Sequence, residues 1–161
     1  MPTYAERKIL PYRPEQMFDL VADIERYPEF LPWCVGCRVT RREGDVVWGD
    51  LIVGFKVFRE SFTSRVTLNR PGRIDVSYID GPFRYLDNHW LFRPESDGRA
   101  TTIDFYIDFE FHSRALQLVA KAAFNEAVRR MVSAFERRAA EIYAPSAAPA
   151  PSPRQSSQPA R

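Results

Sequence analysis

A long segment near the end of the chain, residues 113–143, repeats its apolar residues at helical spacing. Ser113 is a suitable N-cap before it, and Pro145 prevents the helix from continuing. The apolar residues, mostly separated by steps of three and four, are Leu116, Val119, Ala120, Ala123, Phe124, Ala127, Met131, Ala134, Phe135 and Ile142. They form one stripe on a long amphipathic helix, which cannot bury that stripe without a broad partner surface.

The segments before this helix follow a period of two. In residues 57–69, Phe58, Phe62 and Val66 fall on one face, and arginine, serine and threonine fall on the other. One-sided alternation is typical of an antiparallel sheet with one wet face. The predicted strands are residues 3–9, 33–42, 46–54, 57–69, 73–80, 85–94 and 99–111, and the predicted short helices are residues 14–23 and 26–31.

The order of these elements predicts an α+β domain over residues 1–144. Short turns join the last six strands in sequence, so we expect a strongly curved antiparallel sheet of about seven strands. The long helix would cross its concave face, and the space between them is a natural pocket. Residues 145–161 are rich in Pro, Ala and Ser, and we expect a disordered tail.

Composition and charge narrow the class of protein. The net charge of the 161 residues is only +2, so no strong field for polyanions is implied overall. No segment reaches about 18 consecutive apolar residues, so we expect no membrane-spanning helix. Residues 1–10 lack the apolar stretch of a secretory signal, so we expect a cytoplasmic protein whose two cysteines stay reduced.

Cys34 and Cys37 form a CxxC pair with three readings. A redox pair should sit at a helix N-terminus, but this pair enters a strand, where residues three apart point to opposite faces. Half of a zinc site would need a second pair of ligands, and the chain has only two histidines. We therefore expect two small, buried or half-buried residues, and no metal site.

Glu60 interrupts the apolar face that Phe58 and Phe62 define. An inward carboxylate is costly unless it is paired. It is either a polar anchor for a ligand in the pocket or a member of a buried ion pair or hydrogen bond, and the sequence favours neither reading. The strand period predicts that its side chain points between the sheet and the long helix, near Phe124.

Arginines on the exposed side of the long helix are candidates for contact with a membrane or RNA. Arg129, Arg130 and Arg137, with Arg138, form a basic run that usually is a solvated surface. Such a run can also bind anionic lipid or ribosomal RNA.

Catalytic chemistry finds little support in the sequence. We find no Ser-His-Asp set, no phosphate-binding glycine loop and no closely spaced carboxylate pair. His89 and Asp87 share a strand face and could act on a bound polyketide-like ring. With no nucleophile or oxyanion donor, we expect no enzyme activity, and cyclase-like activity is the lesser alternative.

Several motifs in this order carry a family resemblance. They are Leu31-Pro32-Trp33-Cys34, Glu60-Ser61-Phe62-Thr63-Ser64-Arg65-Val66, Asp80-Gly81-Pro82-Phe83-Arg84-Tyr85-Leu86, Asn88-His89-Trp90 and Ile107-Asp108-Phe109-Glu110-Phe111. With the element order, they resemble the coenzyme Q-binding and RatA-like family, which is polyketide cyclase-like and has the START-like helix-grip fold. The resemblance covers roughly residues 1–143.

The resemblance implies a hydrophobic cavity for ubiquinone or a similar isoprenoid lipid. On this reading the protein is a lipid chaperone that supports respiratory electron transport, needs no cofactor and touches the inner membrane face transiently. The family's other role implies a toxin that binds the large ribosomal subunit and blocks subunit association. We expect no DNA partner. The expected ligand-binding residues are Trp33, Phe58, Glu60, Phe62, Phe83, Trp90, Phe105, Phe109 and Phe124.

Overall fold

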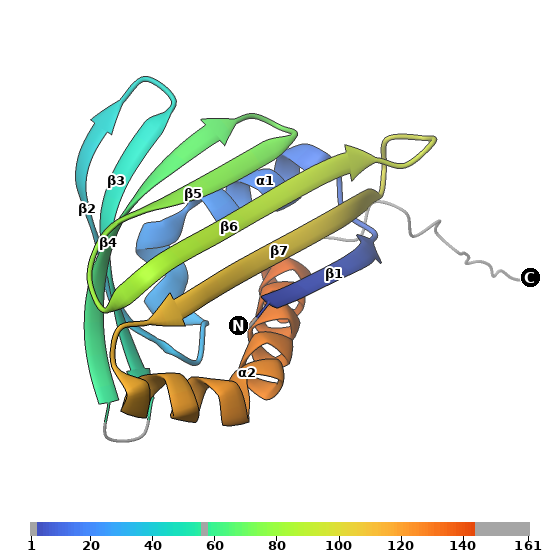
Figure 1. The fold of residues 1–161 in the computed structure, drawn as a ribbon. Coiled ribbons are helices and arrows are strands. Elements are labelled where there is room, and N and C mark those ends of the chain that lie inside the picture. Colours follow the sequence, from blue (N-terminus) through green and yellow to red (C-terminus); the bar gives the residue numbers. More distant parts are fainter. Residues whose placement is uncertain (1–2, 56–57, 144–161) are drawn as a thin grey trace, which may run out of the picture.

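A curved seven-stranded sheet wraps around one long helix in the computed structural model (Figure 1). The structure describes residues 3–55 and 58–143, without the side chains of residues 55 and 58, so the predicted tail at 145–161 lies outside the described residues. The elements are β1 (Thr3–Leu10), α1 (Pro14–Ala22), a 3₁₀ helix η1 (Ile24–Glu29), β2 (Cys34–Glu43), β3 (Val46–Phe55), β4 (Phe58–Asn69), β5 (Arg73–Asp80), β6 (Phe83–Pro94), β7 (Thr101–Phe111) and α2 (Arg114–Ile142).

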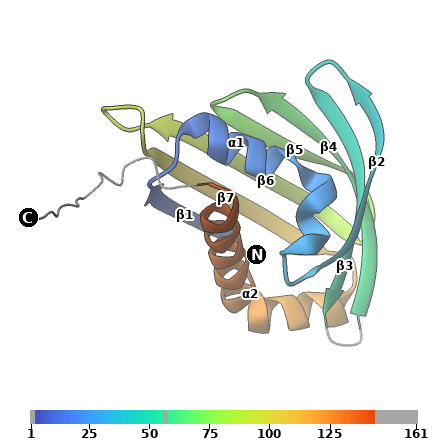
Figure 2. The same cartoon turned by 180° about the vertical axis from the view of Figure 1, so that it is seen from behind.

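All neighbouring strands of the sheet are antiparallel, in the order β1-β7-β6-β5-β4-β3-β2. This confirms the predicted curved sheet and the helix-grip arrangement. β1 joins the sheet beside β7, so the first and last strands in the sequence are neighbours. Viewed from behind, α1 and α2 both lie on the concave side of the sheet (Figure 2).

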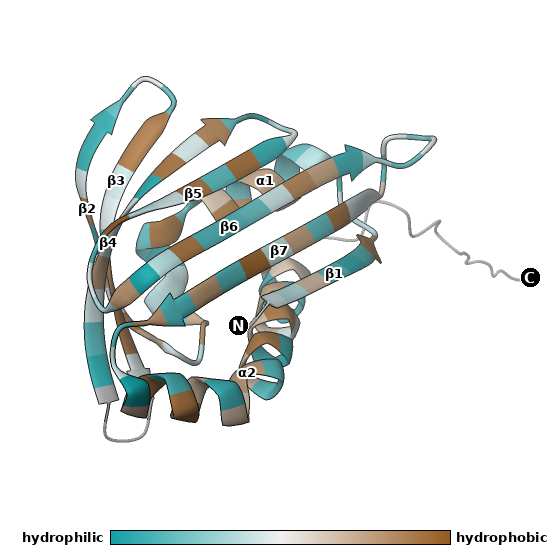
Figure 3. Ribbon diagram, viewed as in Figure 1, coloured by the Kyte–Doolittle hydropathy of each residue, from teal (hydrophilic) through white to brown (hydrophobic). Residues whose placement is uncertain are grey.

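The period of two sorts the strand residues as predicted. On β4, Phe62 and Val66 are buried, whereas Ser61 and Arg65 are exposed. Hydrophobic and hydrophilic residues alternate along β6 and β7 in Figure 3. One face of the sheet therefore forms the core and the other meets water, because successive strand residues point to opposite faces.

The long helix begins as its capping residue predicts. The Ser113 hydroxyl oxygen accepts a hydrogen bond from the Leu116 backbone N–H at 3.2 Å. Phe135 and Ala139 are almost fully buried, but Ile142, which we expected in the stripe, is 49% exposed as the last helical residue. Figures 1 and 2 show α2 bent, with its first turns across one end of the sheet.

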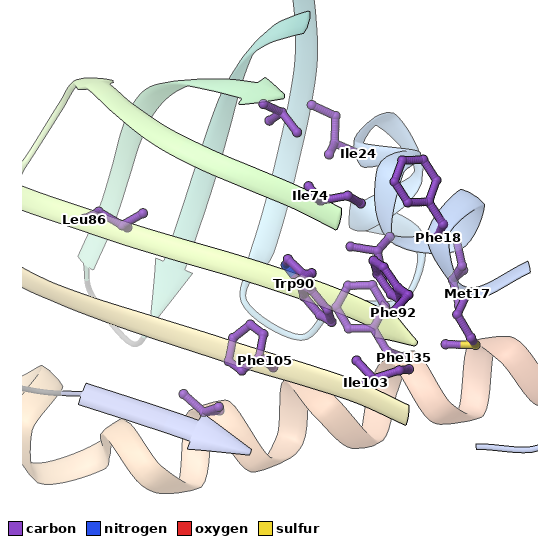
Figure 4. Close-up of a cluster of buried hydrophobic side chains, with 14 of the residues drawn as sticks. Met17, Phe18, Ile24, Ile74, Leu86, Trp90, Phe92, Ile103, Phe105 and Phe135 are labelled. Atoms are coloured by element: carbon purple, nitrogen blue, oxygen red, sulfur yellow. The ribbon is translucent and has the colours of Figure 1, made fainter. Parts of the chain in front are cut away.

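Tightly packed aromatic rings fill the other end of the sheet. The Trp90 ring centroid lies 4.7 Å from that of Phe105 and 5.2 Å from that of Phe135 on α2. Met17 of α1 closes this cluster, and Leu86 lies apart from it, further along β6 (Figure 4). The space left among these side chains is about 30 Å³, the size of a water site. This end of the molecule is therefore a close-packed core.

We predict that Gly81→Ala destabilises the fold more than Gly98→Ala does. Both glycines have positive φ angles, +147° and +73°. A Cβ at Gly81 would lie 2.5 Å from Phe62 Cβ, whereas nothing lies within 4 Å of one at Gly98. Backbone strain should cost Gly98→Ala about 1–2 kcal/mol, and steric overlap should add about 1–3 kcal/mol at Gly81. Urea unfolding followed by circular dichroism measures both, and equal losses would contradict the overlap.

Candidate functional site

A cavity of about 280 Å³ lies between the concave face of the sheet and α2. Glu60 is the one charged residue among the described residues of its lining, and the others are apolar apart from the Trp33 indole N–H and the Cys34 thiol. The lining consists of Leu31, Trp33, Cys34, Leu51, Val53, Glu60, Phe62, Pro82, Phe83, Leu86, Ile107, Phe109, Phe111, Leu116, Val119, Ala120, Ala123, Phe124, Ala127, Val128 and Met131. Such a space is suited to an apolar ligand with one polar group.

Small side chains on α2 create this space. Ala120, Ala123 and Ala127 recur at helical spacing and face the sheet along the cavity. Where α2 instead carries Phe135, the space between helix and sheet is filled by rings. Alanines at these three positions leave room between the helix and the sheet, but Ala134 and Ala139 are buried at the close-packed end, so alanine in the stripe does not by itself mark a cavity.

A continuous row of aromatic rings lines the cavity, from Phe62, Phe83 and Phe109 on the sheet to Phe124 on α2. The ring centroids of Phe62 and Phe83 are 5.3 Å apart, those of Phe83 and Phe109 are 5.5 Å apart, and those of Phe109 and Phe124 are 5.2 Å apart. All three contacts are edge-to-face, the geometry that aromatic pairs favour. The rings hold one another in place and present both edges and faces of aromatic rings to the cavity.

Glu60 points into the cavity, as the strand period predicts. It pairs with Val53 on β3, which pairs with Cys34 on β2, and all three residues line the cavity. The Glu60 side chain is half-buried, and no described residue forms a hydrogen bond or ion pair with its carboxylate. The alternative role for Glu60, a buried ion pair or hydrogen bond within the protein, therefore finds no partner among the described residues.

The structure brings together six of the nine predicted ligand-binding residues. Trp90 and Phe105 lie in the packed core instead, because Met17 and Phe135 fill the space beside them. The side chain of Phe58 lies outside the described residues. The six that line the cavity are Trp33, Glu60, Phe62, Phe83, Phe109 and Phe124. Ala120, Ala123, Ala127 and Met131 also line the cavity, although the sequence analysis predicted them only as part of the apolar stripe of the helix.

Trp33 links the segment before β2 to α2 through a hydrogen bond. Its indole Nε1–H donates a hydrogen bond to the backbone carbonyl of Ala127 at 3.1 Å. Ala127 belongs to the middle of α2, so the segment that precedes β2 is tied to the helix across the cavity rim. Trp33 thus combines an apolar surface toward the ligand space with a polar contact at its edge.

The two cysteines do not point to opposite faces, contrary to our expectation. A β-bulge between Cys34 and Gly36 adds one residue to β2 and shifts the alternation. Cys34 is buried beside the cavity, and Cys37 packs against the core from the same side. Both thiols are free. Burial raises the pKa of Cys34 to about 11; burial and then the Cys34 charge raise that of Cys37 to about 12.

The candidate acid–base residue His89 lies on the outer face of the sheet. Its Nδ1 is 2.6 Å from an oxygen of Asp75, and its ring stacks on Tyr106. It does not line the cavity, so it cannot reach a ring bound there. The structure thereby contradicts the role we considered for His89 and Asp87 on a ligand in this space.

The basic run on α2 divides into three kinds of residue. Arg129 and Arg130 are exposed and both bind the Glu126 carboxylate, at 2.8 and 3.0 Å. Arg137 is exposed, and no described residue pairs with it. Arg138 does not belong to the exposed side, because its side chain is only 17% exposed, pairs with Glu29 and lies over the Phe30 ring.

No group of three or more His, Cys, Asp or Glu side chains in residues 3–55 and 58–143 is placed to hold a metal ion. None of the described helices is long and apolar enough to cross a bilayer.

Comparison with known proteins gives a family match and several relatives. Residues 10–136 match the family described as polyketide cyclase / dehydrase and lipid transport. The ribosome association toxin RatA of Rickettsia prowazekii is 40% identical over 146 residues, covering 88% of this chain and 99% of the toxin. The mitochondrial coenzyme Q-binding protein COQ10 homolog B of Xenopus laevis is 36% identical over 143 residues, covering 87% of this chain and 59% of that protein. A START superfamily protein from Mycobacterium smegmatis has the same fold, with a TM-score of 0.75 at 19% identity over 88% of this chain and 99% of that one.

We predict slow modification of both thiols by iodoacetamide in the native protein. At pH 8 only about one Cys34 in a thousand is ionised when its pKa is about 11, and the thiolate is the reactive form. The native rate should rise about tenfold per pH unit up to pH 11. Because the folded pKa is raised, the protonated thiols stabilise the fold below about pH 9, and that stabilisation is lost as pH rises through 11.

Mass spectrometry of Cys34→Ser and Cys37→Ser variants assigns the rates to each thiol, with guanidinium-unfolded protein as the fast reference. Native labelling at pH 8 that is as fast as unfolded labelling would contradict the buried placement.

Proposed function

Because the chain belongs to the polyketide cyclase, dehydrase and lipid-transport family, we propose that its cavity binds ubiquinone or a similar isoprenoid lipid. The protein would act as a lipid chaperone that supports respiratory electron transport. The observation that carries this proposal is the apolar cavity with one carboxylate at its wall. The similarity to a coenzyme Q-binding protein supports the choice of a quinone.

The dimensions of the cavity define how such a lipid would be held. At about 280 Å³ it lies just below the range of about 300–1,000 Å³ that is usual for small-molecule sites. That volume suits a ring with the first part of its tail, so the rest of a long isoprenoid tail would extend beyond the cavity. Each CH₂ that is buried contributes about 0.8 kcal/mol toward extraction from water.

The ring row explains why a flat head group would be favoured over a plain acyl chain. Phe62, Phe83 and Phe109 present edges and faces of aromatic rings to the space. Ring pairs in such geometry gain about 0.5–1.5 kcal/mol beyond the burial of their area. A quinone ring can make these contacts, whereas a saturated chain gains only from burial.

We predict that Ala123→Trp abolishes lipid uptake and that Ala122→Trp does not. Ala123 lines the cavity, so an indole at this position would occupy the ligand space. Ala122 is its exposed neighbour on α2 and does not line the cavity, which makes it a matched control for an added indole. Native mass spectrometry after incubation with vesicles containing ubiquinone measures uptake.

The fold of both variants is checked by circular dichroism. If the wild-type protein takes up neither quinone nor another lipid from such vesicles, the proposed function fails.

Association with ribosomal RNA is a second candidate function, and a patch on the outer face of the sheet favours it. The Arg41 guanidinium lies 4.6 Å from the centroid of the Trp48 ring. Trp48 pairs with Arg41 on one neighbouring strand and with Arg65 on the other. The Arg41 side chain also forms an ion pair with Glu43. The Arg65 side chain is exposed and forms no ion pair with a described residue. Arginine beside an aromatic ring is the surface on which single-stranded bases stack.

Similarity to the RatA toxin supports this candidate as well. The sheet patch (Arg41, Trp48 and Arg65) and the arginines of α2 are the two surfaces that could carry it. On the helix, one carboxylate of Glu126 already binds two of the three arginines. We therefore favour the sheet patch as the RNA contact.

We predict that an Arg41→Gln, Arg65→Gln double variant weakens co-sedimentation with large ribosomal subunits. An Arg129→Gln, Arg130→Gln, Arg137→Gln variant should retain most of it. Each phosphate contact to a single strand contributes about 0.7 to the slope of log affinity against log salt concentration. The Arg41→Gln, Arg65→Gln variant, which removes two such contacts, should therefore reduce the magnitude of this slope by about 1.4. A wild-type chain that sediments free of ribosomes even at low salt would end this reading.

A further inference from the structure

The cavity has an unbalanced set of polar groups. Among its described lining residues, Trp33 and Cys34 carry the side-chain donors, and both donate to backbone carbonyls: Trp33 to Ala127 at 3.1 Å and Cys34 to Gly36 at 3.5 Å. The acceptor group is the Glu60 carboxylate, which no described residue satisfies. The space therefore offers an acceptor to a ligand and keeps its side-chain donors engaged.

This imbalance discriminates between the two redox forms of a quinone. An ionised carboxylate has acceptor oxygens and no proton to donate. The carbonyl oxygens of an oxidised quinone are also acceptors, so placing one beside Glu60 sets two acceptors against each other. The hydroxyl groups of the reduced quinol donate, and a hydroxyl on a carboxylate makes a strong, charge-assisted hydrogen bond.

We propose that the cavity is selective for the reduced, dihydroxy form of a quinone and that Glu60 determines this selectivity. The inference rests on the proposed lipid-binding function and names the form of the lipid that this site takes. Phe62 lies two residues after Glu60 on the same face of β4 and is the first ring of the aromatic row. A quinol ring packed on Phe62 would therefore place one of its hydroxyl groups beside the Glu60 carboxylate. Quinol and quinone differ little in shape, so the ring row itself does not separate them.

The test compares both redox forms of one probe on the whole chain. Decylubiquinone and its dithionite-reduced quinol are titrated under anaerobic conditions, with calorimetry as the readout. We expect the wild-type protein to bind the quinol at least about tenfold more tightly than the quinone, the factor that one charge-assisted hydrogen bond supplies.

Two variants assign the selectivity to its residue. Glu60→Gln keeps the shape and adds an amide donor, so it should bring the two affinities to within about threefold of each other. Glu110→Gln removes a carboxylate from the outer face, where it pairs with Arg84, and should leave the wild-type ratio unchanged. Melting temperatures measured alongside show whether either variant alters the fold.

Each outcome has one meaning. Equal binding of both forms by the wild-type protein overturns the inference and leaves the lipid-binding function in place. A preference for quinol that persists in Glu60→Gln overturns the role of Glu60. If neither form binds, the proposed function fails, and the inference falls with it.

Discussion

The burial of the apolar stripe of α2 is the constraint on which the rest of the structure depends. A helix of this length needs a broad surface, and the sheet supplies one by curving around it. The two halves of the helix meet that surface differently. Phe135 packs against Trp90 and closes the core, whereas Ala120 and Ala123 leave the sheet uncovered over a cavity. The molecule thus has a close-packed end and an end with a cavity.

An empty cavity carries a free-energy cost that a bound ligand would reduce. Side chains around an empty space lose the dispersion contacts that a filled core would make. A half-buried carboxylate without a described partner adds the cost of lost hydration. Both terms fall when a ring with a donor group occupies the space. Under the proposed function, the features that weaken the fold here would also contribute to the binding free energy of the lipid.

The sequence predicted those features that depend on periodicity. The strands, the cap at Ser113 and the inward position of Glu60 follow from periods of two and 3.6 together with one residue preference, and the structure has them all. It did not predict the bulge near Cys34, because one extra residue in a strand leaves no mark on composition. Nor could it separate Phe109, which lines the cavity, from Phe105, which is core. The two share a strand face, and only the elements packed against them differ.

The outer face of the sheet separates the two candidate functions in space. Trp48 and Arg41 lie on the side that faces water, while Glu60 and Phe62 lie on the concave side, so neither surface needs the other to be empty. The two proposed functions, lipid binding inside and RNA binding outside, therefore do not exclude each other on steric grounds. Any coupling between the two sites would have to pass through β3 and β4, which carry residues of both surfaces in alternate positions. β3 presents Trp48 outward and Leu51 inward, and it is hydrogen-bonded to β2 and β4 along its two edges. Coupling requires an element that can switch between two arrangements, and pairing on both edges holds β3 in one. We therefore expect the two sites to bind independently.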